Sequence, residues 1–478
     1  MSEELTNEIK KRRTFAIISH PDAGKTTLTE KFLLYGGAIN TAGSVKGKAN
    51  SKYAVSDWME IEKERGISVT SSVLQFKYDD FCINILDTPG HQDFSEDTYR
   101  TLMAADSAVM VIDASKGVEA QTIKLFKVCV MRHIPIFTFI NKMDREARDS
   151  FELLDDIESV LGIRTCPVNW PIGSGKRFKG IYDRRAKTVR TFESVSTGGA
   201  KSAAETDYDI NDPALKELAT EELYDQLIDE IELLDGASDP LDLEQVQKGE
   251  LSPVFFGSAL TTFGVETFLK YFLEMTTSPL PRMSNEGEID PLTNDFSAFV
   301  FKIQANMNKA HRDRIAFLRI CSGKFQADKE VYHVQSGRKL RLSQPQQIMA
   351  QDRQVISEAY AGDVIGVFDP GLFSIGDTIT MPGSKFEYEG IPTFAPEHFA
   401  RVIQLNSMKR KQFVKGITQI AQEGAIQIFQ EYTAGMSEII VGVVGVLQFD
   451  VLKYRLENEY GCEIRLESLP YGFIRWVG

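Results

Sequence analysis

The most informative residues form a short loop near the start of the chain. Residues 19–26 read Ser-His-Pro-Asp-Ala-Gly-Lys-Thr and match the phosphate-loop pattern Gly-x-x-x-x-Gly-Lys-Ser/Thr, except that Ser19 replaces the first glycine. Backbone N–H groups of such a loop surround phosphate oxygens, Lys25 adds positive charge, and the Thr26 hydroxyl can bind Mg²⁺. The alternative is a plain turn that caps a helix. The apolar run before the loop and the helical pattern after it favour phosphate binding.

A second loop, residues 87–91, reads Asp-Thr-Pro-Gly-His and directly follows the apolar run at residues 83–86. An acidic residue at the end of a strand, here Asp87, can hold a water of Mg²⁺, and the Gly90 N–H can meet a terminal phosphate. A Pro-Gly turn with a solvated aspartate is the alternative. Adjacent parallel strands deliver their loops to the same edge of a sheet, which favours a site shared with the first loop.

Two further loops indicate which base is bound. Residues 141–144 read Asn-Lys-Met-Asp and follow the apolar run at residues 136–140. The Asp144 carboxylate can accept hydrogen bonds from N1–H and the N2 amino group of guanine, whereas adenine has an acceptor at N1. Alone, this motif could be a helix N-cap. The Ser-Ala-Leu sequence at 258–260, uninformative by itself, has a backbone that can face guanine O6 and complete the base pocket.

The four loops together predict a site for GTP and GDP with Mg²⁺. The residues that we expect to bind the nucleotide are Ser19, His20, Pro21, Asp22, Ala23, Gly24, Lys25, Thr26, Thr27, Asp87, Thr88, Pro89, Gly90, His91, Asn141, Lys142, Met143, Asp144, Ser258, Ala259 and Leu260.

The elements that position these loops are short apolar runs alternating with helical stretches up to about residue 278. That alternation predicts a doubly wound α/β domain with a mostly parallel sheet, of the P-loop type. We place this domain at residues 1–281, with a polar insertion at about 166–250 before the last strand. A linker, 282–295, rich in polar residues and containing proline, follows.

Two smaller domains are expected after the linker. Residues 296–388 alternate apolar and polar residues in short runs separated by glycines, which predicts a β-barrel. Residues 389–478 follow a strand-helix-strand-strand-helix-strand pattern, which predicts a ferredoxin-like α+β domain. We expect this last domain to be truncated at its C-terminus.

Composition narrows the class of protein. The chain has 478 residues, enough for about three domains, and its formal net charge is −14. It therefore lacks the positive field of a protein that coats nucleic acid, and RNA contact must be local. Five scattered cysteines without a paired motif, and the absence of an apolar signal or a long apolar run, predict a reduced, cytoplasmic protein that does not span a membrane.

The order of the four loops, with Arg-Gly-Ile-Ser at 65–68 between the first two, resembles the translational GTPases. The barrel sequences at 361–367 and 376–379 extend that resemblance beyond the first domain. Residues 56–68, 299–307 and 423–427 are similar to class II peptide-chain release factors, the release factor three family. The resemblance covers nearly the whole chain.

The resemblance implies a ribosome-dependent GTPase of translation termination that ejects class I release factors after peptide release, so that they are recycled. In the family, His91 orients the attacking water when large-subunit RNA pushes it into place, and the first switch supplies a Mg²⁺ ligand, here Ser68 in place of threonine. The metal ligands implied are Thr26, Ser68 and Asp87. The switches would span 41–68 and about 87–101. We expect contact with both ribosomal subunits, no membrane or DNA partner, and a monomer.

Three alternatives remain at this point. Elongation or ribosome-protection factors resemble much of the chain but carry large additional C-terminal domains. A GTP-sensing module without turnover has no need of His91. An ATP-dependent P-loop enzyme is opposed by Asn141 and Asp144.

Basic clusters offer candidate RNA contacts. They are residues 409–411, residues 338–341, and Arg312 with Arg314. Each could equally be an ordinary solvated face. The apolar residues Val446, Leu447, Val451, Leu452 and Leu456 repeat at helical spacing and are expected in the core.

Overall fold

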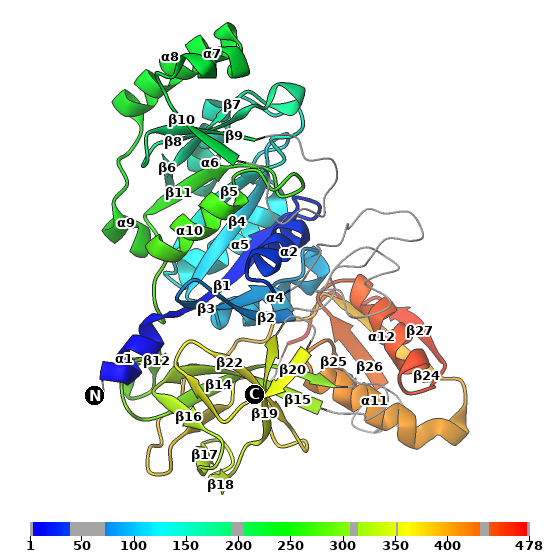
Figure 1. The fold of residues 1–478 in the computed structure, drawn as a ribbon. Coiled ribbons are helices and arrows are strands. Elements are labelled where there is room, and N and C mark those ends of the chain that lie inside the picture. The colour runs from blue at the N-terminus through cyan, green and yellow to red at the C-terminus, as the bar shows by residue number, and fades with distance from the viewer. Residues whose placement is uncertain are drawn as a thin grey trace.

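The computed structural model describes residues 3–38, 72–192, 205–305, 314–349, 352–430 and 439–475. Figure 1 shows a large α/β unit, a β-barrel unit below it and a smaller α/β unit beside the barrel. These three units confirm the predicted fold class.

The first unit is built on a sheet whose described strands lie in the order β2-β3-β1-β4-β5-β11-β6. Neighbours pair in parallel, except that β2 and β3 pair antiparallel. The strands are β1 (Arg12–Ser19), β2 (Ser72–Tyr78), β3 (Phe81–Asp87), β4 (Ser107–Asp113), β5 (Ile136–Asn141), β6 (Arg164–Pro167) and β11 (Leu251–Phe256). The four predicted nucleotide loops follow β1, β3, β5 and β11, at the carboxyl ends of parallel strands.

Helices cover both faces of this sheet, because alternate residues of β1 enter different cores. Phe15 and Ile17 pack in the core that includes the apolar residues of α2 (Lys25–Tyr35), α9 (Leu243–Gln247) and α10 (Val265–Met275). Ala16 and Ile18 pack in the other core, which includes those of α4 (Ser95–Met103), α5 (Ala120–Met131) and α6 (Ser150–Leu161). The first unit is therefore doubly wound.

The predicted insertion is a folded layer, although its polar sequence predicts no particular structure. It contains an antiparallel sheet in the order β10-β9-β8-β7. Trp170 anchors the layer: its side chain is fully buried and its Nε1–H donates to Glu230 Oε2 at 2.6 Å. The elements are β7 (Asn169–Ile172), η2 (Gly175–Arg177), β8 (Gly180–Asp183), β9 (Thr188–Phe192), β10 (Glu205–Asp209), α7 (Pro213–Ala219) and α8 (Glu221–Ala237).

The second unit is an antiparallel barrel-like structure. Its larger sheet has the order β18-β17-β23-β14-β15-β22-β19-β20, and β16 pairs with β21. Helix α1 (Glu3–Lys10) joins it, because Leu5 and Ile9 lie in the barrel core. The strands are β14 (Ser297–Ala305), β15 (Arg314–Ser322), β16 (Lys324–Gln326), β17 (Val331–His333), β18 (Arg338–Leu340), β19 (Ser343–Met349), β20 (Asp352–Val355), β21 (Glu358–Tyr360), β22 (Val364–Phe368) and β23 (Thr378–Thr380). A hairpin, β12 (Arg282–Ser284) and β13 (Gly287–Ile289), precedes them.

The third unit has the predicted ferredoxin-like order of elements. Its antiparallel sheet runs β25-β26-β24-β27. The elements are β24 (His398–Gln404), η3 (Ser407–Lys409), α11 (Arg410–Gln422), β25 (Gln427–Gln430), β26 (Ile439–Val443), α12 (Leu447–Asn458) and β27 (Ile464–Leu469). Of the predicted apolar stripe, Val451, Leu452 and Leu456 are buried. Val446 is 58% exposed, because it precedes the helix and lies off its buried face.

Buried ion pairs and hydrogen bonds join the first two units. Arg319 of β15 donates to Asp106 Oδ2 at 2.5 Å and to the Ala104 carbonyl at 2.9 Å. Arg12 Nε lies 3.2 Å from Asp363 Oδ2. The barrel is therefore fixed against the edge of the first unit opposite the nucleotide loops.

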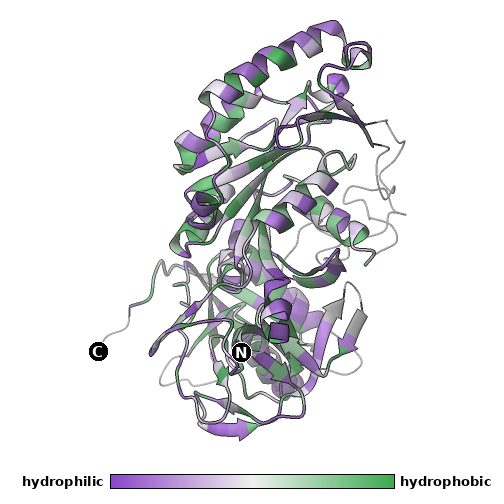
Figure 2. Cartoon of the chain, turned by 60° about the vertical axis from the view of Figure 1, so that its left-hand side comes forward, coloured by the Kyte–Doolittle hydropathy of each residue, from purple (hydrophilic) through white to green (hydrophobic). Residues whose placement is uncertain are grey.

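Hydropathy follows this architecture. In Figure 2 the central strands are mostly green, whereas the long helix at the outer edge carries many purple positions. Among the described residues, no helix is both long enough and apolar enough to cross a membrane.

Candidate nucleotide-binding site

The phosphate loop connects β1 to α2 through a left-handed turn. Asp22 has φ 66° and Gly24 has φ 101°, a conformation that favours glycine. A Cβ on Gly24 would lie 2.2 Å from Asn141 Nδ2, so the loop needs glycine here for space as well. Helix α2 begins at Lys25, which directs its first N–H groups toward the loop. The backbone is thus shaped as an anion-binding helix start.

Lys25 joins the first loop to the second. Its Nζ lies 2.6 Å from Asp87 Oδ1 and also donates to the Thr88 carbonyl oxygen. Both Lys25 and Asp87 are buried. The Thr88 hydroxyl donates to the Ile17 carbonyl at 2.7 Å, which fixes the second loop against β1. The structure therefore brings the two predicted phosphate and metal loops together.

Asn141 joins three of the loops. Its Nδ2–H donates to the Ala23 carbonyl at 2.8 Å, and its Oδ1 accepts from the N–H groups of Lys142 and Ala259, each at 2.8 Å. The side chain is only 2% exposed. One asparagine thus sets the spacing between the phosphate loop and both base loops.

Lys142 makes a second bridge to the phosphate loop. Its Nζ donates to the Asp22 carbonyl at 2.5 Å and to Asp113 Oδ2 at 2.6 Å. Burial alone would raise the pKa of Asp113, but hydrogen bonds from Lys142 and Ser115 outweigh it and hold that pKa below its ordinary value. Asp113 therefore stays ionised and anchors Lys142.

The base loops meet at Asp144. The Ser258 hydroxyl donates to Asp144 Oδ1 at 2.6 Å and accepts from the Thr261 N–H at 3.3 Å. Asp144 is half-buried, and Leu260 is 48% exposed. Met143 is buried, and its N–H donates to the Gly257 carbonyl at 3.1 Å. A carboxylate held by one oxygen keeps further lone pairs for donors such as those of guanine.

His91 lies at the start of the short turn η1 (Gln92–Phe94), between β3 and α4. Its Nδ1 accepts a hydrogen bond from the Asp93 N–H at 3.3 Å, and its side chain is 36% exposed. Gly90 packs close to the phosphate loop, since a Cβ there would lie 3.7 Å from Pro21 Cα. The second loop therefore approaches the first along its length.

Some predicted residues receive a different or no structural account. Ser68 and the predicted first switch, 41–68, lie outside the described residues. Thr26 and Thr27 are half-buried at the start of α2, and Ser19 is buried at the end of β1. Pro89 and Ala259 lie within the second and fourth loops as predicted, and Ala259 is fully buried.

Two acidic residues of the site were missed by the sequence reasoning. Asp113 directly follows the apolar run of β4, so the rule that identified Asp87 could have found it. Glu119 Oε1 lies 3.4 Å from Nε2 of His20 in the phosphate loop, and no local pattern announces that contact.

The loops fit a polar ligand and a hard metal ion. Within the part of the chain that the structure describes, His20 Nδ1 and Thr261 Oγ1 are buried without a hydrogen-bond partner, one in the phosphate loop and one beside Ser258. The hydroxyl of Thr26 and the carboxylate of Asp87 are the oxygen donors that Mg²⁺ prefers. Fold and site together define a P-loop guanine-nucleotide-binding protein of the translation-factor type.

Comparison with known proteins defines the family more closely. Family models match at residues 10–278 (Elongation factor Tu GTP binding domain), 295–381 (Elongation factor G domain 2) and 388–478 (Class II release factor RF3, C-terminal domain). A crystal structure of a protein from Thermus thermophilus has a TM-score of 0.76 at 22% identity, covering 96% of this chain and 67% of that one, and shows the shared fold.

Relatives named peptide chain release factor 3 match almost the whole chain. The protein of Symbiobacterium thermophilum is 60% identical over 475 residues, covering 99% of this chain and 90% of the relative. That of Gloeobacter violaceus is 57% identical over 473 residues, covering 99% and 89%. The chain belongs to the peptide chain release factor 3 family of translational GTPases.

Proposed function

We propose that this GTPase acts on the ribosome after peptide release, where it promotes the dissociation and recycling of class I release factors. The observation that carries the proposal is the convergence of four nucleotide loops in a chain whose last unit matches the class II release factor family. Residues 1–281, 296–388 and 389–478 form its nucleotide-binding, barrel and ferredoxin-like domains, joined by a linker at 282–295.

In this proposal the phosphate loop and Lys25 hold the nucleotide. Backbone N–H groups at residues 20–26 surround the phosphates, and Lys25 exchanges its bond to Asp87 for the β- and γ-phosphate oxygens. Thr26, Asp87 and Ser68 hold Mg²⁺, which supplies charge neutralisation to the phosphates when bound.

Asp144 selects guanine in the base pocket. Ser258 holds one of its oxygens at 2.6 Å, which orients the carboxylate toward N1–H and the N2 amino group. Asn141 and Ala259 fix the pocket's distance from the phosphate loop through their shared hydrogen bond. ATP loses these donors and meets an acceptor at N1, so GTP and GDP are preferred.

His91 orients the attacking water. It lies on the turn after the Asp87 strand, beside the loop that meets the γ-phosphate. Its hydrogen bond from the Asp93 N–H leaves the ring dependent on an outside push for its final position. Hydrolysis is therefore slow alone and fast on the ribosome, where large-subunit RNA supplies the push.

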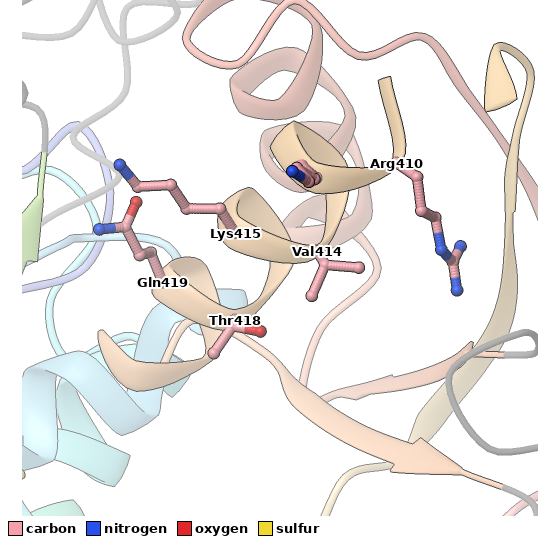
Figure 3. Close-up of a pocket in the computed structure, with 6 residues that line it drawn as sticks. Arg410, Val414, Lys415, Thr418 and Gln419 are labelled. Atoms are coloured by element: carbon pink, nitrogen blue, oxygen red, sulfur yellow. The ribbon is translucent and has the colours of Figure 1, made fainter. Parts of the chain in front are cut away.

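Helix α11 offers a surface for ribosomal RNA. Figure 3 shows Arg410, Lys415 and Gln419 along the exposed side of this helix, where a pocket is also lined by Lys411, Val414 and Thr418. The helix has no acidic residue, although the chain's net charge is −14. Such a local basic face can bind phosphates against an unfavourable overall field.

Of the other basic clusters, residues 338–341 include exposed Arg338, Lys339 and Arg341. Arg314 does not fit an RNA contact, because it is buried and donates to Asp369 at 2.7 Å. Arg312 lies outside the described residues. We further propose contacts with both ribosomal subunits, a cytoplasmic location, a monomeric state, and no DNA or membrane partner.

The test measures GTP turnover and binding of a fluorescent GDP, each with and without ribosomes. We expect slow turnover alone and strong stimulation by ribosomes. His91→Ala should keep GDP affinity and lose the stimulated turnover, whereas His398→Ala, a change at an exposed histidine of β24, should keep both. Stimulation that survives in His91→Ala, or no stimulation of the unmodified chain, would contradict the proposal.

A further inference from the structure

The turn that carries His91 also determines how its ring is held. The Asp93 N–H donates to His91 Nδ1 at 3.3 Å, and the imidazole lies edge-on to the Phe94 ring with centroids 6.3 Å apart. Because Nδ1 accepts, the proton of the neutral ring is on Nε2. Movement of the Asp93 backbone therefore changes both the orientation and the tautomer of His91.

The side chain of Asp93 attaches the same turn to the third unit. Asp93 Oδ2 accepts a hydrogen bond from the Leu447 N–H, at 2.7 Å. Leu447 is the first residue of α12, and the preceding residue, Val446, supplies no side-chain cap. Asp93 is thus the cap of a helix that lies 354 positions later in the chain, and its negative charge suits the positive end of that helix.

Close packing at Gly445 depends on the same contact. A Cβ at Gly445 would lie 2.3 Å from both Cβ and Cγ of Asp93, so the two segments touch only because this residue is glycine. A second attachment lies nearby: Arg100 of α4 donates to the Gly424 carbonyl at 3.2 Å, in the turn after α11. The third unit is therefore seated directly on the segment η1–α4 that follows His91.

We propose that Asp93 is a positioning residue for GTP hydrolysis. While the third unit is seated, α12 holds Asp93, and Asp93 holds the His91 ring against its own turn. Lifting the third unit releases Asp93 and leaves the ring able to turn toward the nucleotide. This inference rests on the proposed role of His91 in orienting water, and it adds that the third unit restrains that role.

The size of the effect follows from the contact that is lost. A helix cap of this kind shifts an equilibrium about fivefold. Removing it should therefore raise GTP turnover without ribosomes about fivefold, and lower the stimulation by ribosomes in proportion. KM for GTP should stay unchanged, because Asp93 and Gly445 lie outside the four loops.

Two variants weaken the contact from opposite sides. Asp93→Ala removes the cap, and Gly445→Ala separates the segments without changing Asp93 or His91. The matched control is Asp450→Ala, which removes an exposed acidic residue from the first turn of the same helix. Each is measured for kcat and KM without ribosomes, and the tautomer of His91 is read from its imidazole ¹⁵N signals, assigned by His91→Gln.

We expect Asp93→Ala and Gly445→Ala to raise kcat and alter the His91 signals, and Asp450→Ala to change neither. The increase should vanish when either variant is combined with His91→Gln. Unchanged kcat and unchanged His91 signals in both folded variants would overturn the restraint while the role of His91 stands. Ribosome-stimulated turnover that persists in His91→Gln would instead refute the proposed role of His91 itself.

Discussion

Replacing Asn141 with alanine should loosen the nucleotide site without unfolding the sheet. The side chain lies at the carboxyl end of β5 and contacts the phosphate loop on one side and the Ser258 loop on the other. Asn141→Ala would leave the Ala23 carbonyl and the N–H groups of Lys142 and Ala259 without their present partner.

The magnitude follows from those three hydrogen bonds, each 2.8 Å long. A buried polar group that loses its partner costs about 1–3 kcal/mol. Three groups at the lower end of that range give about 3 kcal/mol, and each 1.4 kcal/mol is about tenfold in affinity. The free loops relax, and binding must restore their geometry, so GDP affinity should fall about 100-fold.

Titration with a fluorescent GDP measures this loss. The control is Asn84→Ala, which also removes a buried asparagine with three hydrogen bonds, to Thr14, Gln75 and Gly362, near the barrel. It should lower the free energy of unfolding but leave GDP affinity within about twofold in the folded protein. Equal affinities for Asn141→Ala and the unmodified chain would refute the reasoning that Asn141 organises the loops.

Three other changes test other parts of the account. Asp144→Asn should favour xanthosine over guanosine diphosphate in competition assays, since an amide can donate to the xanthine O2; an unchanged preference would remove Asp144 from base selection. Asp113→Asn should lower the free energy of unfolding by about 1–2 kcal/mol at pH 7. Because the folded pKa of Asp113 is depressed, this difference should be present above about pH 4 and shrink as the pH falls further, and urea titrations that show a constant difference would contradict it. Arg319→Met should cost about 3–5 kcal/mol, because burial already raises the pKa of Asp106 and Arg319 is the strongest of the groups that oppose it; a cost no larger than that of exposed Arg338→Met would argue against the buried pair.

The nucleotide loops were predictable because each depends on local order in the chain. An apolar run followed by a polar loop identifies the carboxyl end of a buried parallel strand, and several such ends meet at one edge. The same order placed β25, β26 and the two helices of the third unit close to their observed bounds.

What the sequence could not predict depends on partners far away in the chain. Arg314 belongs to a basic cluster in the sequence but is buried, because Asp369 of another segment pairs with it. The insertion has polar segments, yet it folds around Trp170 and its bond to Glu230. The cap of α12 by Asp93 joins residues of different units and leaves no pattern in either segment.

The most direct test of the proposed function follows one labelled class I release factor on ribosomes after peptide release. Adding this protein with GTP should make the labelled factor leave faster, and the acceleration should be lost in Asn141→Ala at low nucleotide concentration and restored as GTP is raised. Departure of the factor at the same rate with and without this protein, while the protein still hydrolyses GTP on those ribosomes, would contradict the account.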